Sequence, residues 1–156
     1  MEKTNVMRLL AAAKIDFVAH EYDPDLTDGN AVAAALNQDP DHVFKTLVTT
    51  GATPRSYYVF CVPVNQTLNL KKAARAVGEK SIEMLKQKDL LGLTGYIHGG
   101  CSPIGMKKKF PTVINDTAQL FETVVISAGR RGFQVELSPE ALAKYVPATF
   151  EDIIEN

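Results

Sequence analysis

Near the middle of the 156-residue chain, an unbroken apolar and aromatic run, Tyr57–Val62, limits the possible folds more than any other segment. A run in which nearly every residue is apolar or aromatic predicts a strand that is buried on both faces, because a half-exposed strand would alternate with polar residues. Such a strand belongs in the interior of a sheet. The fold must therefore supply neighbouring strands and cover both faces of the sheet.

The periodicity of the other segments predicts several consecutive strands, which excludes a strict alternation of strands and helices. We expect a mixed α/β fold in which a mixed or antiparallel sheet curls into a barrel-like shape surrounded by helices. A chain of this length can bury one core, which predicts a single domain over 1–156. Strands are expected at 17–22, 43–49, 57–62, 81–85, 112–115, 123–127 and 133–137, and helices at 4–13, 28–36, 69–77, 86–91 and from 138, with a last helical segment from Thr149.

Charge is distributed unevenly, although 17 Lys+Arg nearly balance 18 Asp+Glu. Residues 1–44 carry 3 basic and 8 acidic side chains, residues 45–131 carry 13 and 5, and residues 132–156 carry 1 and 5. The basic middle indicates a polyanionic partner that is contacted locally. Its cations form three clusters: Lys71-Lys72 with Arg75, Lys107-Lys108-Lys109, and Arg130-Arg131. These clusters favour phosphate contacts with a nucleic acid over binding of a small acidic metabolite, and a solvated surface is the alternative.

The glycine-rich segment Gly95–Gly105 is the strongest local candidate for chemistry. The paired glycines Gly99 and Gly100 permit positive φ angles and a close approach of the backbone, so that N–H groups can point at a carbonyl or a developing oxyanion. The alternative is a wide structural loop. Lys45 lies in an otherwise apolar strand; it is a positioned charge if the strand lines a pocket, and otherwise it points to solvent.

Several other chemistries lack the residues that they need. Cys61 and Cys101 form no C-x-x-C pair, which excludes a zinc ribbon or a dithiol redox motif. We expect two reduced thiols, and a single disulfide is the alternative. A nucleophilic pair of Cys101 with His98 has no motif context, and no metal-ligand spacing, dinucleotide fingerprint or Walker motif occurs, so we expect neither a metal nor a cofactor. Nothing approaches a membrane span and the N-terminus is a poor secretory signal, which predicts a soluble, cytoplasmic protein.

Several motifs follow one another along the chain in the same order as in a known protein family. The motifs are Phe44–Val48, Leu70–Ala74, Gly95–Gly105 with the following lysines, Pro111–Ile114 and Ser127–Gly132. Over nearly the whole chain they resemble the YbaK family of aminoacyl-tRNA deacylases, which is related to the editing domain inserted in bacterial prolyl-tRNA synthetases. The resemblance implies the mixed, barrel-like fold and hydrolysis of the ester between a wrong amino acid and tRNA. In free-standing YbaK proteins, that substrate is Cys-tRNA(Pro).

The resemblance also implies roles for individual residues. Lys45 would be needed for activity and lie near the terminal nucleotide, and the loop Gly99–Pro103 would hold the aminoacyl carbonyl through its backbone N–H groups. The residues expected to be catalytic are Lys45, Gly99 and Gly100. Residues expected to bind the substrate are Tyr22, Thr46, Cys101, Ser102, Pro103, Ser127, Gly129 and Gln134. Residues expected to bind tRNA are Lys71, Lys107, Lys108, Lys109, Arg130 and Arg131. Gln134 departs from the family pattern, because some members have an aspartate there.

The family chemistry requires no catalytic triad or metal, because the resemblance implies that the thiol of the substrate attacks its own carbonyl and releases a cyclic thiolactone. The expected partner is the acceptor end of an aminoacyl-tRNA, with prolyl-tRNA synthetase as a further one. Two alternatives stay open: a catalytically silent tRNA-binding or synthetase-associated module, and a small-molecule hydrolase that uses Cys101.

Overall fold

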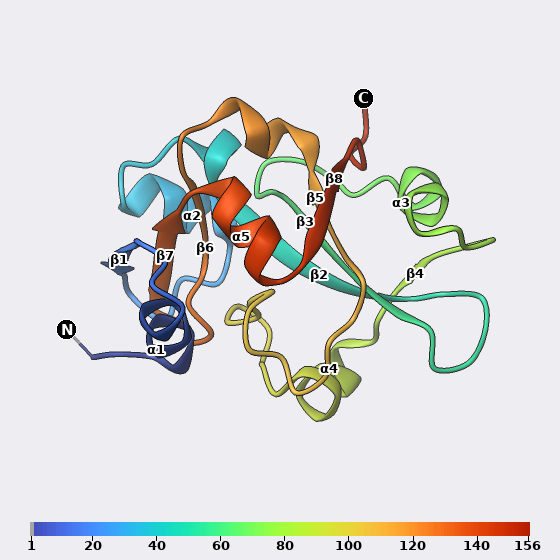
Figure 1. The fold of residues 1–156 in the computed structure, drawn as a ribbon, viewed down its shortest axis with the longest axis horizontal. Coiled ribbons are helices and arrows are strands. Elements are labelled where there is room, and N and C mark those ends of the chain that lie inside the picture. Colours follow the sequence, from blue (N-terminus) through green and yellow to red (C-terminus); the bar gives the residue numbers. More distant parts are fainter. Residues whose placement is uncertain (1) are drawn as a thin grey trace.

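The computed structural model describes residues 2–156 and contains two β-sheets with helices packed around them (Figure 1). The first sheet is antiparallel, with the order β1 (Val18–Glu21), β7 (Phe133–Leu137) and β6 (Val124–Ser127). The second sheet is mixed, with the order β4 (Glu83–Met84), β2 (Phe44–Thr50), β3 (Tyr57–Pro63), β5 (Thr112–Asn115) and β8 (Ala148–Glu151). In this sheet, β2 is antiparallel to β3 and β4, whereas β3, β5 and β8 are parallel.

Strand β3 lies inside the second sheet, as its apolar run predicts. It is flanked by β2 and β5, and all four residues from Val59 to Val62 have an exposed fraction of 0%. Alternate side chains enter two different cores: Cys61 packs with residues of α1 (Asn5–Ala12) and the first sheet, whereas Phe60 and Val62 pack with residues of α3 (Leu70–Val77). Burial on both faces is therefore confirmed.

Local capping signals determine where the helices begin. The Thr4 side chain caps α1, Asp28 caps α2 (Gly29–Ala35), Asn69 caps α3 and Ser138 caps α5 (Pro139–Tyr145). The remaining helix, α4 (Gln87–Thr94), has no side-chain cap, and two short 3-10 helices cover Pro40–His42 and Asp116–Leu120. No helix within residues 2–156 is long and apolar enough to span a membrane.

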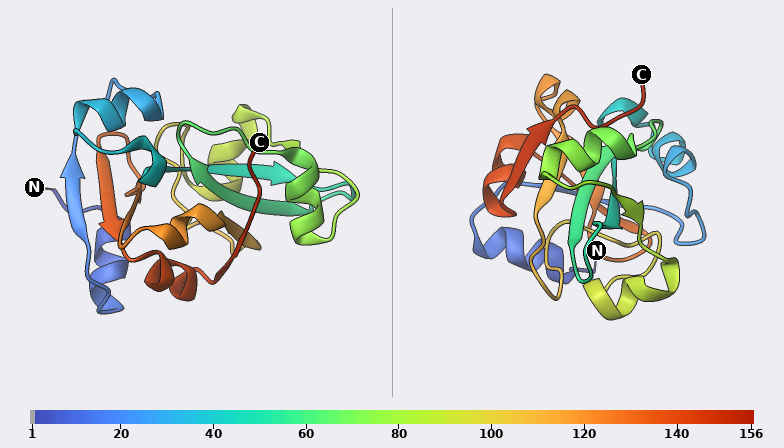
Figure 2. Two further views of the ribbon diagram at one scale, coloured as in Figure 1. Left: turned by 90° about the horizontal axis from the view of Figure 1, so that it is seen from above. Right: turned by 90° about the vertical axis from the view of Figure 1, so that its right-hand side faces the viewer.

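The two sheets meet where β2 begins. Val43 forms a parallel bridge to Val125 of β6, and both residues are buried together with Ala33 and Val64. Figure 2 shows that β1 and β7 run across the direction of β2 and β3. The expected mixed α/β class is thus confirmed, but the sheets do not close into a barrel, so the barrel-like description is not confirmed.

The helical segment expected from Thr149 is wrong, because this segment is strand β8. Thr149 and Phe150 pair in parallel register with Val113 and Ile114 of β5. The edge of β5 offers backbone donors and acceptors that need partners, and this distant pairing outweighs the local preference of a four-residue segment.

Candidate active site

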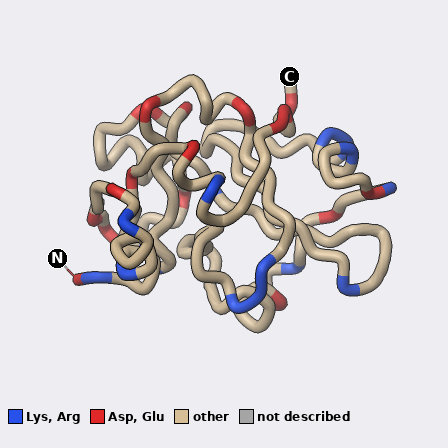
Figure 3. The backbone as a smooth tube through the Cα atoms, viewed as in Figure 1, with Lys and Arg blue, Asp and Glu red and all other residues tan. Residues whose placement is uncertain are grey.

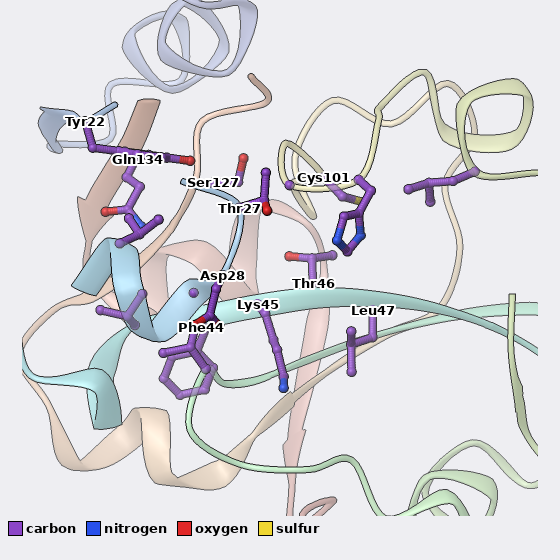
Figure 4. Close-up of a pocket in the computed structure, with 17 residues that line it drawn as sticks. Tyr22, Thr27, Asp28, Phe44, Lys45, Thr46, Leu47, Cys101, Ser127 and Gln134 are labelled. Carbon is purple, nitrogen blue, oxygen red and sulfur yellow. The ribbon is translucent and has the colours of Figure 1, made fainter. Parts of the chain in front are cut away.

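A cavity of about 450 Å³ wraps around the edge of β2 (Figure 4). Its walls come from the segment that leads into α2, the first half of β2, the glycine loop after α4, and the adjoining ends of β6 and β7. The fold therefore gathers residues from distant parts of the chain. Among the expected site residues, those that line the cavity are Tyr22, Lys45, Thr46, Gly99, Cys101, Ser127 and Gln134.

The edge of β2 is open beside this cavity, because β4 pairs only with the far end of β2. The Val43 carbonyl accepts a hydrogen bond from Val64 N at 2.8 Å, and the Val48 carbonyl accepts one from Leu85 N at 3.0 Å on the opposite edge. Backbone groups alternate in direction along a strand, so odd-numbered residues bond to β3 and even-numbered residues face outward. The N–H and C=O of Thr46 therefore face the cavity and are available to an occupant.

Lys45 and Thr46 project to opposite sides of β2, and both border the cavity (Figure 4). The half-buried Lys45 side chain thus lines a pocket, which is the first of the two alternatives for this residue. Burial lowers the pKa of its ammonium group, and the negative charge of Asp28 partly offsets this effect. Removing Lys45 from bulk water strengthens its interaction with any anion that enters the cavity.

The glycine loop is held by hydrogen bonds at two points. The Gly100 N–H donates to the Ile97 carbonyl at 3.0 Å, and Nε of Arg131 donates to the His98 carbonyl at 2.8 Å. Gly99 has a φ of +88°, and a Cβ atom there would lie 3.0 Å from Nε of Arg131. Glycine at position 99 is therefore required both by the backbone conformation and by the close approach of Arg131.

The Gly100 amide is occupied by the turn, which leaves its neighbours as the donors that the loop can offer. Gly99 and Cys101 line the cavity, and within the described residues 2–156 neither N–H has a hydrogen-bond acceptor. Two such N–H groups near one point can bind a carbonyl oxygen or an oxyanion.

The two cysteines lie on the Thr46 side of β2 and are free thiols. Figure 4 shows Cys101 across from Thr46, and the Thr46 hydroxyl lies 3.9 Å from Sγ of Cys61. Burial, together with a smaller effect of the neighbouring Cys61, raises the pKa of the Cys101 thiol to about 12. Burial likewise raises the pKa of Cys61 to about 12. Both thiols are protonated at neutral pH, which makes Cys101 a poor nucleophile.

The opposite wall of the cavity is formed where β6 and β7 pair. Ser127 lies opposite Gln134 in the antiparallel register, and the Ser127 hydroxyl accepts a hydrogen bond from Gly129 N at 3.1 Å. The Gln134 side chain is only 7% exposed, and its Oε1 has no hydrogen-bond partner among residues 2–156. A buried amide oxygen without a donor is costly, so this atom is suited to accept a hydrogen bond from an occupant.

Four expected site residues do not line the cavity: Gly100, Ser102, Pro103 and Gly129. Ser102 is fully buried, and its hydroxyl accepts a hydrogen bond from Ile104 N at 3.3 Å. Gly129 belongs to the turn that bonds to Ser127. These residues shape the loop and the turn behind the cavity wall.

The expected tRNA-binding cations occupy different surroundings. Figure 3 shows basic residues around α3 and around α4 with the loop that follows it, whereas acidic residues gather around α2 and the C-terminus. Lys71 and the three lysines from Lys107 to Lys109 are exposed. Arg130 pairs with the carboxylate of Glu2 and lies over the ring of Phe133, and Arg131 is bound to the His98 carbonyl. The two arginines are therefore already engaged within the protein.

Sequence reasoning missed much of the cavity wall. Its additional residues are Thr27, Asp28, Gly29, Val32, Val43, Phe44, Leu47, Val64, Leu90 and His98. Asp28 was recognisable only as a helix cap, and no pattern in the sequence connects the start of α2 with β2. Within residues 2–156, no three His, Cys, Asp or Glu side chains are grouped so as to hold a metal ion.

Two solved structures share this fold. One, described as "Crystal structure of a putative trans-editing enzyme for prolyl tRNA synthetase", superposes with a TM-score of 0.84 at 22% identity and covers 100% of both chains. The other, described as "Crystal structure of hypothetical protein APE2540", has a TM-score of 0.88 at 21% identity and covers 96% of this chain and 99% of its own. At these identities the likeness establishes the fold alone.

Sequence comparisons identify the family. A protein of Enterococcus faecalis named "Putative Cys-tRNA(Pro)/Cys-tRNA(Cys) deacylase EbsC" is 44% identical over 154 residues, which is 97% of this chain and 93% of that protein. A proline--tRNA ligase of Shouchella clausii is 26% identical over 110 residues, or 70% of this chain and 19% of the ligase. The family model for the aminoacyl-tRNA editing domain matches residues 23–145. The chain therefore belongs to the aminoacyl-tRNA editing domain family.

Proposed function

We propose that the protein is a trans-editing deacylase that hydrolyses mischarged aminoacyl-tRNA, with Cys-tRNA(Pro) as its preferred substrate. Family membership supports the class of reaction, and the name of the 44% identical relative supports the amino acid and the tRNA. The observation that carries the proposal is the cavity at the edge of β2. It offers a half-buried cation, free backbone groups and an unpartnered amide oxygen to one occupant.

In this proposal, the two sides of β2 bind different parts of the substrate. The ammonium of Lys45 contacts the phosphate of the terminal nucleotide on one side, because it is a desolvated cation at the cavity. The aminoacyl ester lies on the other side, between Thr46 and the glycine loop. The α-ammonium of the amino acid donates to Oε1 of Gln134, which has no hydrogen-bond partner among residues 2–156.

The ester carbonyl is held by backbone N–H groups. The amides of Gly99 and Cys101 are the donors that the loop leaves free, and the outward-facing N–H of Thr46 is a third. Gly100 has a structural part in this proposal, because its N–H closes the turn with Ile97. Loss of one such donor reduces the rate of an acyl-transfer enzyme by about 10²–10³.

The nucleophile in this proposal is the thiol of the substrate. Its sulfur bonds to the carbonyl carbon, the carbon–oxygen bond of the ester breaks, and the thiol proton passes to the ribose oxygen of the departing tRNA. The product is a four-membered thiolactone, which water opens to cysteine. The raised pKa of Cys101 supports this assignment, because a protonated, buried thiol of the protein does not compete as the nucleophile.

The test is deacylation of labelled Cys-tRNA(Pro), with Ala- and Ser-charged tRNAs in parallel and Lys45→Ala as the variant. We expect rapid loss of cysteine, slower loss of alanine and serine, and a strongly impaired variant. Salt-dependent binding of tRNA without hydrolysis of any ester would instead favour the silent binding module. We also propose that prolyl-tRNA synthetase presents the tRNA to this enzyme in the cytoplasm. Added prolyl-tRNA synthetase should then increase the rate of deacylation.

A further inference from the structure

A second hollow region lies beyond α4 and the glycine loop. It consists of two cavities of about 290 Å³ each, which share Lys108 and Phe110 in their walls. We call their joint surface the basic-aromatic groove. Its defining residues are Arg55, Tyr57, Leu93, Lys108, Lys109, Phe110 and Tyr145.

The aromatic centre of the groove is held by the β3–β5 ladder. Val59 pairs in parallel with Thr112, so Tyr57 and Phe110, which precede these two residues by two positions, come to lie side by side. Their rings meet edge to face, with centroids 5.5 Å apart and planes at 65°. The Thr112 hydroxyl also donates to the Phe110 carbonyl at 2.9 Å. Both rings are only half-buried, so each keeps aromatic surface that a planar ligand can contact.

The rim of the groove is positively charged. Arg55, Lys108 and Lys109 are exposed, and no Asp or Glu lines either cavity. Among the described residues 2–156, no salt bridge engages these three cations. Arg55 is held at the rim by the tip of the β2–β3 hairpin, where Gly51 N donates to the Ser56 carbonyl at 2.8 Å. Cations without counter-charges beside half-exposed rings match the chemistry of an unpaired nucleic acid strand.

The groove and the candidate active site are separated by α4 and the glycine loop. Helix α4 borders both regions, with Leu90 in the wall of the active-site cavity and Leu93, one turn later, in the groove. The loop does the same, because Cys101 lines the first cavity and Pro103 lines the groove. An extended strand whose end lies in the first cavity has to cross α4 or the glycine loop to enter the groove.

We infer that the basic-aromatic groove binds the unpaired nucleotides that precede the terminal one in the acceptor end of tRNA. Bases stack on Phe110 and Tyr57, and the phosphates between them contact Arg55 and Lys108. The inference rests on the proposed function, since it assumes that the terminal nucleotide occupies the cavity at β2. It explains why the chain keeps a second charged hollow that contains none of the residues around the ester.

The first test measures binding of deacylated tRNA by Lys108→Ala and Phe110→Ala, with Lys80→Ala as the matched control. Lys80 is also exposed, but it lies outside both cavities. We expect Phe110→Ala to weaken binding at least about fivefold, as loss of one stacked base does. Lys108→Ala should reduce the slope of log affinity against log salt by about 0.7. Phe110→Tyr should bind like the wild type, which separates loss of stacking from misfolding. Equal affinities and slopes in all variants would overturn the inference.

The second test compares two substrates of the wild type and the groove variants: full-length Cys-tRNA(Pro), and cysteine esterified to adenosine alone. The groove variants should lose activity only on the tRNA, because adenosine does not reach the groove. Equal losses on both substrates would contradict a role in binding the strand. If the wild type hydrolyses neither ester while the groove variants still bind tRNA less tightly, the proposed function fails and the groove assignment stands.

Discussion

Replacing Gly99 with alanine separates two reasons for a glycine at this position. The φ of +88° costs any other residue about 1–2 kcal/mol. The new Cβ would also lie 3.0 Å from Nε of Arg131, which must shift by a few tenths of an ångström. We expect this shift to break the hydrogen bond from Arg131 to the His98 carbonyl, a loss of about 0.5–1.5 kcal/mol. We therefore expect Gly99→Ala to reduce the free energy of unfolding by the sum of the two, about 1.5–3.5 kcal/mol.

Gly78 provides a matched control. It has a φ of +75° at the end of α3, and a Cβ there would meet nothing within 4 Å. Gly78→Ala should therefore cost only the conformational part, about 1–2 kcal/mol. Urea unfolding at pH 7 measures both values with sufficient precision.

Activity distinguishes the two glycines more sharply. Displacement of Arg131 releases the loop that carries Gly99, so Gly99→Ala should lower kcat/KM for Cys-tRNA(Pro) about 10- to 100-fold, whereas Gly78→Ala should leave it unchanged. In an Arg131→Ala background, Gly99→Ala should cost no more stability than Gly78→Ala. Equal unfolding free energies for the two single variants, together with full activity of Gly99→Ala, would refute this account of the loop.

Three further predictions concern charged and nucleophilic groups. Lys45→Met should be at least as stable as the wild type, because burial already disfavours the charged ammonium. Its rate of deacylation should nevertheless fall about 30-fold or more. A large loss of unfolding free energy in this variant would contradict the prediction. Cys101→Ala should keep most of its activity, and iodoacetamide should alkylate Cys101 slowly at pH 8, because the pKa of its thiol is raised to about 12. Burial alone would raise the pKa of Glu136, but hydrogen bonds from Thr123 at 2.5 Å and His20 at 2.8 Å lower it below 4.5. The stability from these contacts is present above pH 4.5 and is lost as the pH falls through the lowered pKa of Glu136. Between pH 6 and pH 3, the unfolding free energy of Glu136→Gln should therefore fall less than that of the wild type.

Features that depend on neighbouring residues could be predicted from the sequence. The start of α3 at Asn69 and its end at Gly78 follow from side-chain capping and a left-handed glycine, and the burial of β3 follows from its composition. Strand β8 could not be predicted, because it exists only through its pairing with β5.

The same limit applies to the site. The glycine loop and Lys45 were recognisable as candidates, but the sequence could not indicate that Ile97 would occupy the Gly100 amide. Nor could it place Asp28 beside Lys45, since that proximity depends on how α2 packs against the start of β2. These contacts arise from the tertiary structure, and no local pattern encodes them.

The alternating backbone of β2 has a consequence for hydrogen exchange. The amides of Lys45 and Leu47 donate within the sheet and should exchange only when the strand opens, whereas the Thr46 amide between them faces the cavity and should exchange rapidly. Binding of an ester analogue should slow Thr46 alone among these three positions. A single backbone amide thus becomes a reporter of occupancy in a strand that otherwise stays protected, and it needs no substitution.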